Sequence, residues 1–422
     1  MTYPLFHRCP LLLLFLATSL TGMAQDFDQY FTDATLRLDY VFAGDASHQE
    51  IAVDALHQLP RWYGKRHRLS EVPMRGNGQV IVRAHSTGTV IYRNSFSTLF
   101  QEWLSYPESQ TVRRSFENVF LTPMPKDTAD VTIELYNNRQ EVMATLTHTV
   151  VPTDILIRRT GYSNVTPYVT LQQAADTTRC IHIAYVAEGY QTDEMETFLD
   201  DVREAMSALF SHEPFKSLRD RFHIVALLSP SVDSGTSSPR KGIWKNTVLH
   251  SHYDTFYSER YLTTLHLKDL HDCLAGTPYE HIIVLVNSEQ YGGGGILNSY
   301  NLTSTHHSRF KPVVVHEFGH SFAGLGDEYA YEAEDVPMYP HDVEPWEPNL
   351  TTLVDFHNKW EDLIDMDKKS KQSRIGVFEG AGYSLKGVYR ACQDCRMRTN
   401  EYPVFCPVCD RALRRVINFY TE

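Results

Sequence analysis

The sequence predicts an N-terminal all-β sandwich followed by an α/β domain. In residues 25–151, short β-branched and aromatic runs are separated by turn signals such as Gly76-Asn77-Gly78, a pattern that favours antiparallel strands. In residues 152–422, apolar runs of strand length alternate with a segment of helical periodicity, which is typical of an α/β layer. A length of 422 residues suits two or three domains of ordinary size.

The first domain, residues 25–151, is expected to be a small antiparallel sandwich. Leu36, Leu38 and Tyr40 alternate with polar residues, as in a half-buried strand. Further strands are expected at residues 80–82, 89–92, 131–136 and 142–150. The sequence of this region shows no constellation of metal-ligating or nucleophilic residues, so we expect it to support the second domain or to dock substrate.

The second domain, residues 152–422, is expected to alternate strands and helices. Strands are predicted at residues 180–186, 222–228 and 282–286. Residues 194–210 are predicted to be a helix, because apolar residues recur on one side of it: Phe198, Val202, Ala205, Met206 and Leu209.

The most informative stretch is His316-Glu317-Phe318-Gly319-His320, which follows the apolar run Val313-Val314-Val315. Two histidines four residues apart on a helix project from the same face, so both imidazoles can reach one metal ion. Glu317 follows the first histidine directly, which places its carboxylate beside the metal, where a base for bound water belongs. This is the H-E-x-x-H signature of zinc peptidases.

A catalytic zinc site needs a third protein ligand and one open position. In the long metzincin pattern, a glycine turns the chain out of the helix and the third ligand follows three residues later. Asp327 follows Gly324 at that interval, so we predict that Asp327 is the third ligand. Glu328 is its closest competitor, and a glutamate from a later helix is the alternative geometry, for which the chain offers Glu344, Glu347 and Glu361.

Other residues are candidates for supporting roles. Metzincins place a methionine beneath the metal on a tight turn, and Met397 fits that position, with an ordinary core methionine as the alternative. Tyr329 and Tyr402 are candidate donors to the transition state. Four histidines near the motif are conceivable ligands or acids, although such residues are more often surface or hydrogen-bonded histidines: His306, His307, His341 and His357.

With these residues the chain resembles the IgA peptidase family of bacterial zinc metallopeptidases. The resemblance covers about residue 155 to the C-terminus, and the preceding segment resembles the accessory N-terminal domain of that family. It implies a metzincin-like zinc endopeptidase with His316 and His320 as ligands and Glu317 as catalytic base, but not that immunoglobulin A is the substrate. Besides the motif, Gly324 and Asp327-Glu328-Tyr329, the matching stretches are Ala187-Glu188-Gly189-Tyr190, Asn287 to Gly295, Cys395-Arg396-Met397-Arg398 and Phe405-Cys406-Pro407-Val408-Cys409.

The last four cysteines form two C-x-x-C pairs that are ten residues apart: Cys392, Cys395, Cys406 and Cys409. This spacing suits a structural zinc site, but in an exported chain two disulfides compete with it. We expect disulfides here, with a second, structural zinc as the alternative, and either would brace the turn that carries Met397. Cys180 and Cys273 are expected to be either paired with each other or free and buried.

The N-terminus predicts export. A weakly basic start precedes the apolar run 11–16, and Gly22-Met23-Ala24 offers small residues for cleavage, so residues 1–24 fit a signal peptide. The run is too short to span a bilayer comfortably, and no other apolar run in the sequence approaches the length of a transmembrane helix. We therefore expect a secreted, periplasmic or cell-surface protein without an integral membrane segment after cleavage. A formal net charge of −13 argues against a nucleic-acid partner.

Two loops are of interest for the predicted site. Tyr291 to Gly295 is rich in glycine but lacks the Lys-Ser/Thr pair of a phosphate loop, and before the active helix it could bring backbone close to an extended peptide. Residues 229–242 form either a loop near the cleft or a plain surface loop.

The sequence as a whole predicts a secreted zinc endopeptidase that hydrolyses protein or peptide substrates with metal-activated water. One alternative is a non-catalytic, zinc-containing binding or adhesion protein, against which the intact Glu317 argues, since a structural zinc has no use for that carboxylate. The other alternative is a zinc amidase acting on cell-wall peptide, which shares the chemistry and differs in substrate.

Overall fold

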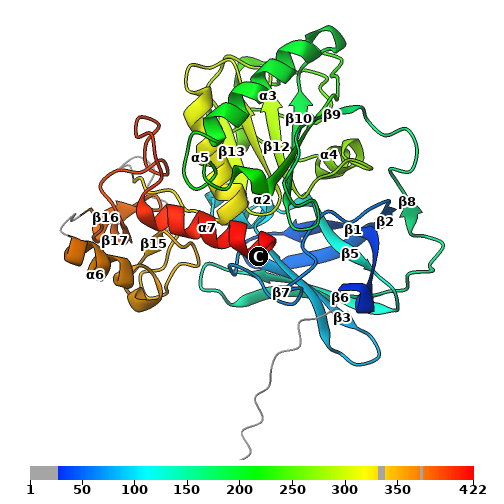
Figure 1. Ribbon diagram of the computed structural model, residues 1–422, viewed down its shortest axis with the longest axis horizontal. Coiled ribbons are helices and arrows are strands. Elements are labelled where there is room, and N and C mark those ends of the chain that lie inside the picture. The colour runs from blue at the N-terminus through cyan, green and yellow to red at the C-terminus, as the bar shows by residue number, and fades with distance from the viewer. Residues whose placement is uncertain (1–26, 331–337, 371–373) are drawn as a thin grey trace, which may run out of the picture.

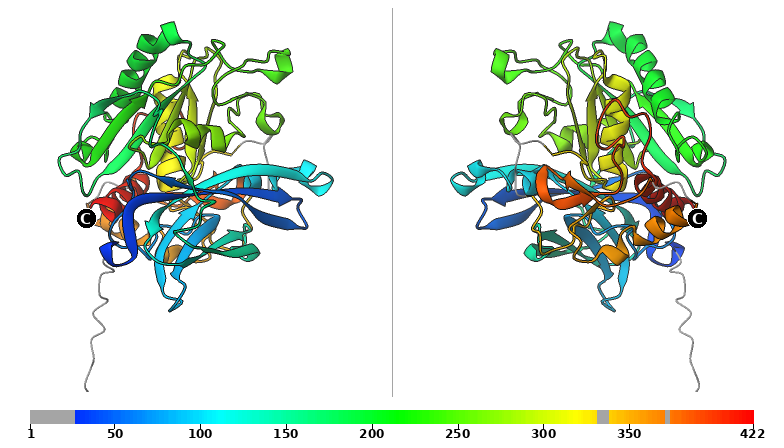
Figure 2. Two further views of the ribbon diagram at one scale, coloured as in Figure 1. Left: turned by 90° about the vertical axis from the view of Figure 1, so that its right-hand side faces the viewer. Right: turned by 90° about the vertical axis from the view of Figure 1, so that its left-hand side faces the viewer.

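The protein is represented by a computed structural model that describes residues 27–330, 338–370 and 374–422. The expected signal peptide, residues 1–24, lies outside the described residues. Figure 1 and Figure 2 show an N-terminal β region, a mixed α/β layer on one side of it, and a smaller C-terminal part beside both.

The N-terminal region forms two four-stranded sheets. The first has the order β5-β1-β2-β8, with the bounds Arg114–Pro125, Phe31–Gly44, Gln49–Leu59 and Arg158–Arg159. The second has the order β4-β3-β6-β7, with the bounds Val90–Phe96, Gly78–Ala84, Ala129–Tyr136 and Val142–Val150. Neighbouring strands are antiparallel except β2 and β8. The predicted all-β character is confirmed, whereas β2 and β5 were not predicted.

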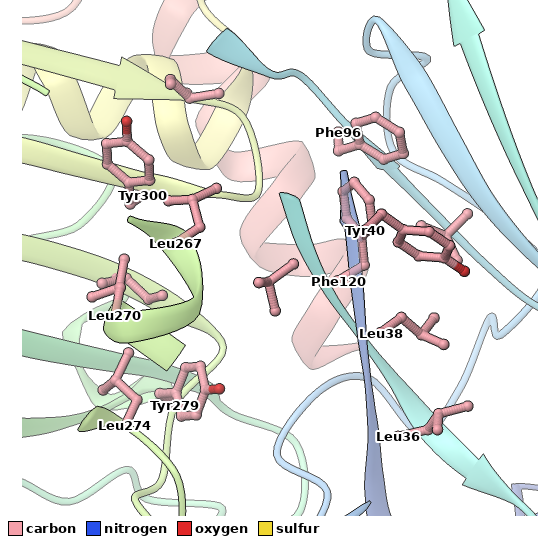
Figure 3. Packing of buried hydrophobic residues seen from close by; sticks show 14 of the residues in the cluster. Leu36, Leu38, Tyr40, Phe96, Phe120, Leu267, Leu270, Leu274, Tyr279 and Tyr300 are labelled. Carbon is pink, nitrogen blue, oxygen red and sulfur yellow. The ribbon is translucent and has the colours of Figure 1, made fainter. Parts of the chain in front are cut away.

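The two sheets share a hydrophobic core that continues into the next region. The rings of Phe96 and Phe120 pack at a centroid distance of 4.3 Å between the sheets. The same buried cluster contains Leu38 of β1 together with Leu267 and Leu270 of α4 (Leu267–Cys273), as Figure 3 shows. The N-terminal sheets therefore pack directly against the α/β layer.

A buried arginine also connects the two regions. Arg37 of β1 is 1% exposed, and its Nε and Nη2 donate to the Asp39 carboxylate at 2.7 and 2.8 Å. Its Nη1 reaches Asp272 of α4 at 2.5 Å. Because an isolated buried charge is costly, these two carboxylates are needed to compensate the charge of the buried guanidinium.

The α/β layer is built on a six-stranded mixed sheet. The inner strands β14, β12, β10 and β11 are parallel, and the edge strands β13 and β9 are antiparallel to their neighbours. In sheet order β13-β14-β12-β10-β11-β9, the bounds are Gly293–Ile296, Tyr300–Ser304, His281–Val286, Ile181–Glu188, Phe222–Leu227 and Tyr168–Gln172. The predicted strands at 180–186, 222–228 and 282–286 are confirmed as β10, β11 and β12.

Both faces of this sheet are buried, because alternate residues of a strand point to opposite faces. Along β10, Ala184 and Val186 belong to the core shared with the N-terminal sheets. Ile183 and Tyr185 belong to a second core, formed with α3 (Met195–Leu209), α5 (Phe310–Ala323) and α7 (Pro407–Thr421). The helix predicted at 194–210 is confirmed as α3.

The C-terminal part contains a small antiparallel sheet of order β15-β17-β16 and helix α6. Their bounds are Leu350–Thr351, Ser384–Arg390, Phe378–Ala381 and Glu361–Ser370. The remaining short α-helices are α1 (Phe27–Tyr30) and α2 (Leu99–Trp103), and the 3₁₀ helices span Pro107–Gln110, Thr192–Glu194, Arg219–Arg221, Pro239–Lys241, Thr255–Tyr257 and Phe356–Asn358. Within the described ranges, none of the helices combines the length and the apolar character that crossing a bilayer requires.

Candidate metal centre and active site

Helix α5 carries the H-E-x-x-H motif and ends at the glycine that the sequence singled out. Gly324 has φ = 58°, the left-handed conformation that favours glycine at a helix C-terminus. A Cβ at this position would lie 2.5 Å from the Trp346 ring and 2.8 Å from Sδ of Met74. The chain therefore reverses here, and Asp327 returns to the motif.

His316, His320 and Asp327 are brought together by this reversal. Nε2 of His316 lies 3.0 Å from Nε2 of His320 and 3.0 Å from Oδ1 of Asp327. Nε2 of His320 lies 3.3 Å from the same Oδ1. Tetrahedral ligands at 2.0–2.1 Å from zinc are about 3.3 Å apart, so the three atoms have the spacing of ligands to one metal ion.

The hydrogen bonds of the two imidazoles also favour a cation between them. Nδ1 of His316 lies 3.0 Å from the carbonyl oxygen of Arg396, and Nδ1 of His320 lies 2.5 Å from that of Leu325. Each Nδ1–H donates to its carbonyl, which leaves the Nε2 lone pairs facing each other and the Asp327 carboxylate. These acceptor atoms must share a proton or a metal ion, and their nature suits zinc.

The charged side chains of this cluster shift one another's pKa values. Burial lowers the pKa of His320, but the Asp327 carboxylate outweighs it and raises the pKa to about 9. Burial would raise the pKa of Asp327, but the neighbouring His320 and His316 hold it well below its ordinary value. Burial raises the pKa of Glu317 above its ordinary value, the direction expected of a carboxylate that transfers protons.

Glu317 lies beside the cluster and against the edge strand β13. A Cβ at Gly293 would be 2.7 Å from Oε1 of Glu317, and a Cβ at Gly295 would be 2.3 Å from its carbonyl oxygen. The glycine-rich stretch therefore forms a strand that packs closely along α5. Its outer edge is in part covered by a bridge between Tyr261 and Gly293.

The alternative ligands have other contacts. Tyr339 donates to Glu347 at 3.1 Å, Thr352 donates to Glu344 at 3.2 Å, and Glu361 is an exposed residue in the first turn of α6. His306 contacts Asp201 at 3.0 Å and His357 contacts Asp355 at 2.8 Å. His341 lies against Gly387, and His307 packs at 5.2 Å from the Tyr291 ring.

Met397 lies next to α5, as the sequence suggested. It is fully buried, and its Sδ would lie 2.8 Å from a Cβ at Gly319. Its carbonyl oxygen accepts the N–H of Glu328 at 2.9 Å. The Met397 turn therefore contacts both the motif helix and the segment that carries Asp327.

Two groups near the cluster were missed by sequence reasoning. Tyr383, in the turn between β16 and β17, donates to Oδ2 of Asp327 at 2.5 Å, and its hydroxyl lies 3.2 Å from that of Tyr329. Glu102 of α2 accepts a hydrogen bond from Tyr261 at 2.5 Å, and burial raises its pKa to about 7. Both come from elements distant in sequence, where no local pattern marks them. Tyr402 is 37% exposed.

Family models match most of the chain. The model of IgA peptidase M64 matches residues 169–369 and 365–417, and the model of the peptidase M64 N-terminus matches residues 26–147. The chain belongs to the IgA peptidase M64 family. Membership identifies it as a peptidase and bears out the resemblance found in the sequence.

Individual proteins add little to this assignment. No curated protein matches this M64 peptidase. Among solved structures, metalloproteinase-II from Bacteroides fragilis is similar over 60% of this chain and 85% of that chain, with 13% sequence identity and a TM-score of 0.23.

The Glu188 stretch of this M64 peptidase has a structural role. At the end of β10, the buried Glu188 accepts hydrogen bonds from Thr247 Oγ1 at 2.6 Å and from the N–H groups of Leu249 and Ser251 at 2.9 Å each. Gly189 has φ = 74°, and a Cβ there would lie 2.3 Å from a backbone oxygen of the 229–242 loop. This stretch therefore fixes that loop to the sheet.

The four C-terminal cysteines of the M64 peptidase are not joined by disulfides. All four are free and buried, and Sγ of Cys395 lies 3.7 Å from Sγ of Cys409, far beyond a disulfide bond of about 2.05 Å. The expectation of disulfides is therefore wrong for this structure. Cys180 and Cys273 are also free; Cys180 is buried and Cys273 is partly buried.

Proposed function

We propose that this M64 peptidase is a zinc-dependent endopeptidase that cleaves protein substrates. The observation that carries the proposal is the convergence of two imidazole lone pairs and one carboxylate oxygen within 3.0–3.3 Å of one another, with Glu317 next to them. His316, His320 and Asp327 would hold the metal and leave one position open, which is the arrangement of catalytic zinc sites.

Each residue then has a defined part in hydrolysis. When bound, zinc polarises the scissile carbonyl and lowers the pKa of a water molecule towards about 7. Glu317 accepts a proton from the attacking water and delivers it to the leaving amine nitrogen. Tyr383 holds Asp327 in place through its hydrogen bond and so orients this ligand.

The edge strand β13 is the proposed binding element for substrate. It lies at the end of the six-stranded sheet and packs along α5. An extended peptide added at a sheet edge gains main-chain hydrogen bonds, and the part of the β13 edge that the Tyr261–Gly293 bridge leaves uncovered is the place proposed for it. Such a peptide would pass Glu317, whose carboxylate lies against Gly293.

The metzincin-like fold of the catalytic domain and the export of the protein are further parts of the proposal. Gly324, the interval to Asp327 and the Met397 turn beside α5 favour a metzincin-like catalytic domain. The pattern of residues 1–24 favours cleavage and export. The activity would therefore be secreted, periplasmic or at the cell surface.

A digest of casein or gelatin tests the proposal. We expect cleavage that a chelator abolishes and that added zinc restores. Glu317→Gln should lower kcat/KM by about 10²–10⁴-fold, the usual contribution of a general base, while the metal content stays unchanged. Glu361→Gln, at an exposed position of α6, is the matched control and should retain activity.

The same assay separates the alternatives. Bound metal without cleavage of any protein substrate would support a binding or adhesion protein and overturn the proposal. Cleavage of cell-wall peptide but not of casein or gelatin would support the amidase instead. Parental activity in Glu317→Gln would remove Glu317 from the role of base.

A further inference from the structure

A second group of metal-ligating side chains lies on the opposite side of the Asp327-Glu328 pair. The Sγ atoms of Cys395, Cys406 and Cys409 and a carboxylate oxygen of Glu328 all lie within 4.8 Å of one another. All four residues are buried, and Glu328 is 0% exposed. We propose that these four side chains bind a structural zinc ion that is separate from the active-site metal.

The distances fit a single tetrahedral ion. With zinc–sulfur bonds of about 2.3 Å, two thiolates are about 3.8 Å apart, and Sγ of Cys395 and Sγ of Cys409 are 3.7 Å apart. A thiolate and a carboxylate oxygen on the same ion are about 3.6 Å apart. Oε1 of Glu328 lies 3.1 Å from Sγ of Cys409 and 3.9 Å from Sγ of Cys406, on either side of that value.

The Glu328 carboxylate lacks sufficient partners without a cation. Its Oε1 accepts from Nδ2 of Asn349 at 2.9 Å. Its Oε2 is buried and has no hydrogen-bond partner among the residues that the structure describes. A buried carboxylate with an unsatisfied oxygen costs free energy. A cation bound here would offset that cost, which the hydrogen bonds from the described neighbours do not remove.

Two of the three cysteine sulfurs accept backbone N–H groups, a contact that favours the thiolate, the form that binds zinc. Sγ of Cys395 accepts the N–H groups of Cys406 at 3.2 Å and Met397 at 3.5 Å. Sγ of Cys406 accepts the N–H of Cys409 at 3.5 Å and caps the N-terminus of the 15-residue α7. Backbone N–H donors and the positive end of a helix stabilise a negative sulfur.

Cys392 is the one cysteine of the two C-x-x-C pairs outside this group. It is buried beside Cys406, but its Sγ does not belong to the four-member set. Three thiolates and one carboxylate on Zn²⁺ leave a net negative charge, which the Arg390 guanidinium near Glu328 partly balances. Cys392 is therefore a matched control for the three proposed cysteine ligands.

The proposed zinc would hold the walls of the first site. Cys395 lies two residues before Met397, whose carbonyl oxygen accepts the N–H of Glu328. The carbonyl oxygen of Arg396, between them, accepts Nδ1–H of His316. The second ion would thus fix both chain segments that support the first site. Binding of this second ion does not depend on the proposed peptidase mechanism.

Metal analysis of the whole chain tests the inference without an activity assay. The parent chain, purified with reductant, should contain two zinc ions, and the double variant His316→Ala/His320→Ala should contain one. Cobalt added to the metal-free double variant should produce thiolate-to-cobalt absorption. In that background, Cys406→Ser or Cys409→Ser should abolish the absorption, and Cys392→Ser should keep it.

The Glu328 ligand is tested in the same background. Glu328→Gln should weaken cobalt binding by at least about tenfold, since even partners of ligands cost 10–100-fold. If Cys392→Ser loses the metal while Glu328→Gln keeps it, the site is made of four thiols and the proposed donor set is overturned.

A measurement on the unsubstituted chain guards against variants that fail to fold. A thiol-specific mercurial should release one zinc ion per parent chain to a chromophoric chelator. The intact mass before and after reduction should be equal. A mass that rises by four hydrogen atoms on reduction would show two disulfides and overturn the inference, as would a double variant that folds but holds no metal.

Discussion

Two neighbouring clusters of the molecule differ in almost every property except the segment that supplies them. Asp327 reaches His316 and His320, whereas the next residue, Glu328, reaches Cys406 and Cys409. Consecutive side chains of this non-helical segment point to opposite sides, so one short stretch contributes a carboxylate to each cluster.

The clusters differ in donor atoms and in access. The first offers nitrogen and oxygen, and its side chains keep 9–15% exposure. The second offers mainly sulfur, and its members are at most 2% exposed. Catalytic zinc sites keep an open position and structural sites are closed, so the difference supports the proposed catalytic role of the first cluster and the proposed structural role of the second.

The largest expected effect comes from exchanging each carboxylate in turn. Asp327→Asn should lower zinc affinity at the first site, and kcat/KM with it, by more than about 100-fold, because losing a ligand costs more than the 10–100-fold of losing its partner. The second site should keep its zinc. Zinc content and kcat/KM measured on the same preparation check both statements.

Glu328→Gln is the matched counterpart at the adjacent position. It should lower zinc affinity at the thiol cluster and affect activity only through the weakened support of Asp327. If Glu328→Gln abolished binding at the histidines while Asp327→Asn left it intact, the two carboxylates would have been assigned to the wrong clusters.

The contrast also shows where sequence reasoning succeeds. His316, His320 and Asp327 lie within twelve residues of one another, so helical periodicity and one glycine predict their convergence. The strands β10, β11 and β12 were also predicted from local sequence, since each is a mostly apolar run of strand length.

Sequence reasoning fails where segments that are distant in the chain meet in the structure. The thiol cluster combines Glu328 with cysteines that are more than sixty residues away, and the cysteine spacing alone could not exclude disulfides. Tyr383 and Glu102 reach the first site from a turn and a short helix without periodicity. β2 was not predicted although apolar residues alternate along part of it, and only two of its residues, His57 and Leu59, are buried.

An intermediate effect is expected for the hydrogen bond that Tyr383 donates to Asp327. Tyr383→Phe removes the donor 2.5 Å from Oδ2 of Asp327 and keeps the ring. Partners of metal ligands usually contribute about 10–100-fold to metal affinity or activity, so we expect a loss in that range at the first site and none at the thiol cluster. Titration with a competing chelator measures both affinities.

Tyr339→Phe is the control for this substitution, because the Tyr339 hydroxyl donates to Glu347 at 3.1 Å and not to Asp327. It should leave both affinities unchanged. An equal loss in Tyr339→Phe and Tyr383→Phe would mean that general loosening of the C-terminal part, and not the Asp327 contact, weakens the first site.

The smallest effect is expected at Met397, which lies between the two clusters. Its backbone contacts Glu328 and its side chain packs against Gly319, so its role is packing and its sulfur is not needed as a ligand. Met397→Leu nearly conserves volume and should destabilise the fold by less than about 1.5 kcal/mol, with both zinc ions retained. Chemical denaturation and zinc analysis check this, with Met366→Leu at a 54% exposed position of α6 as the control. Loss of one zinc from a folded Met397→Leu chain would contradict this prediction and show that one of the two sites depends on the thioether.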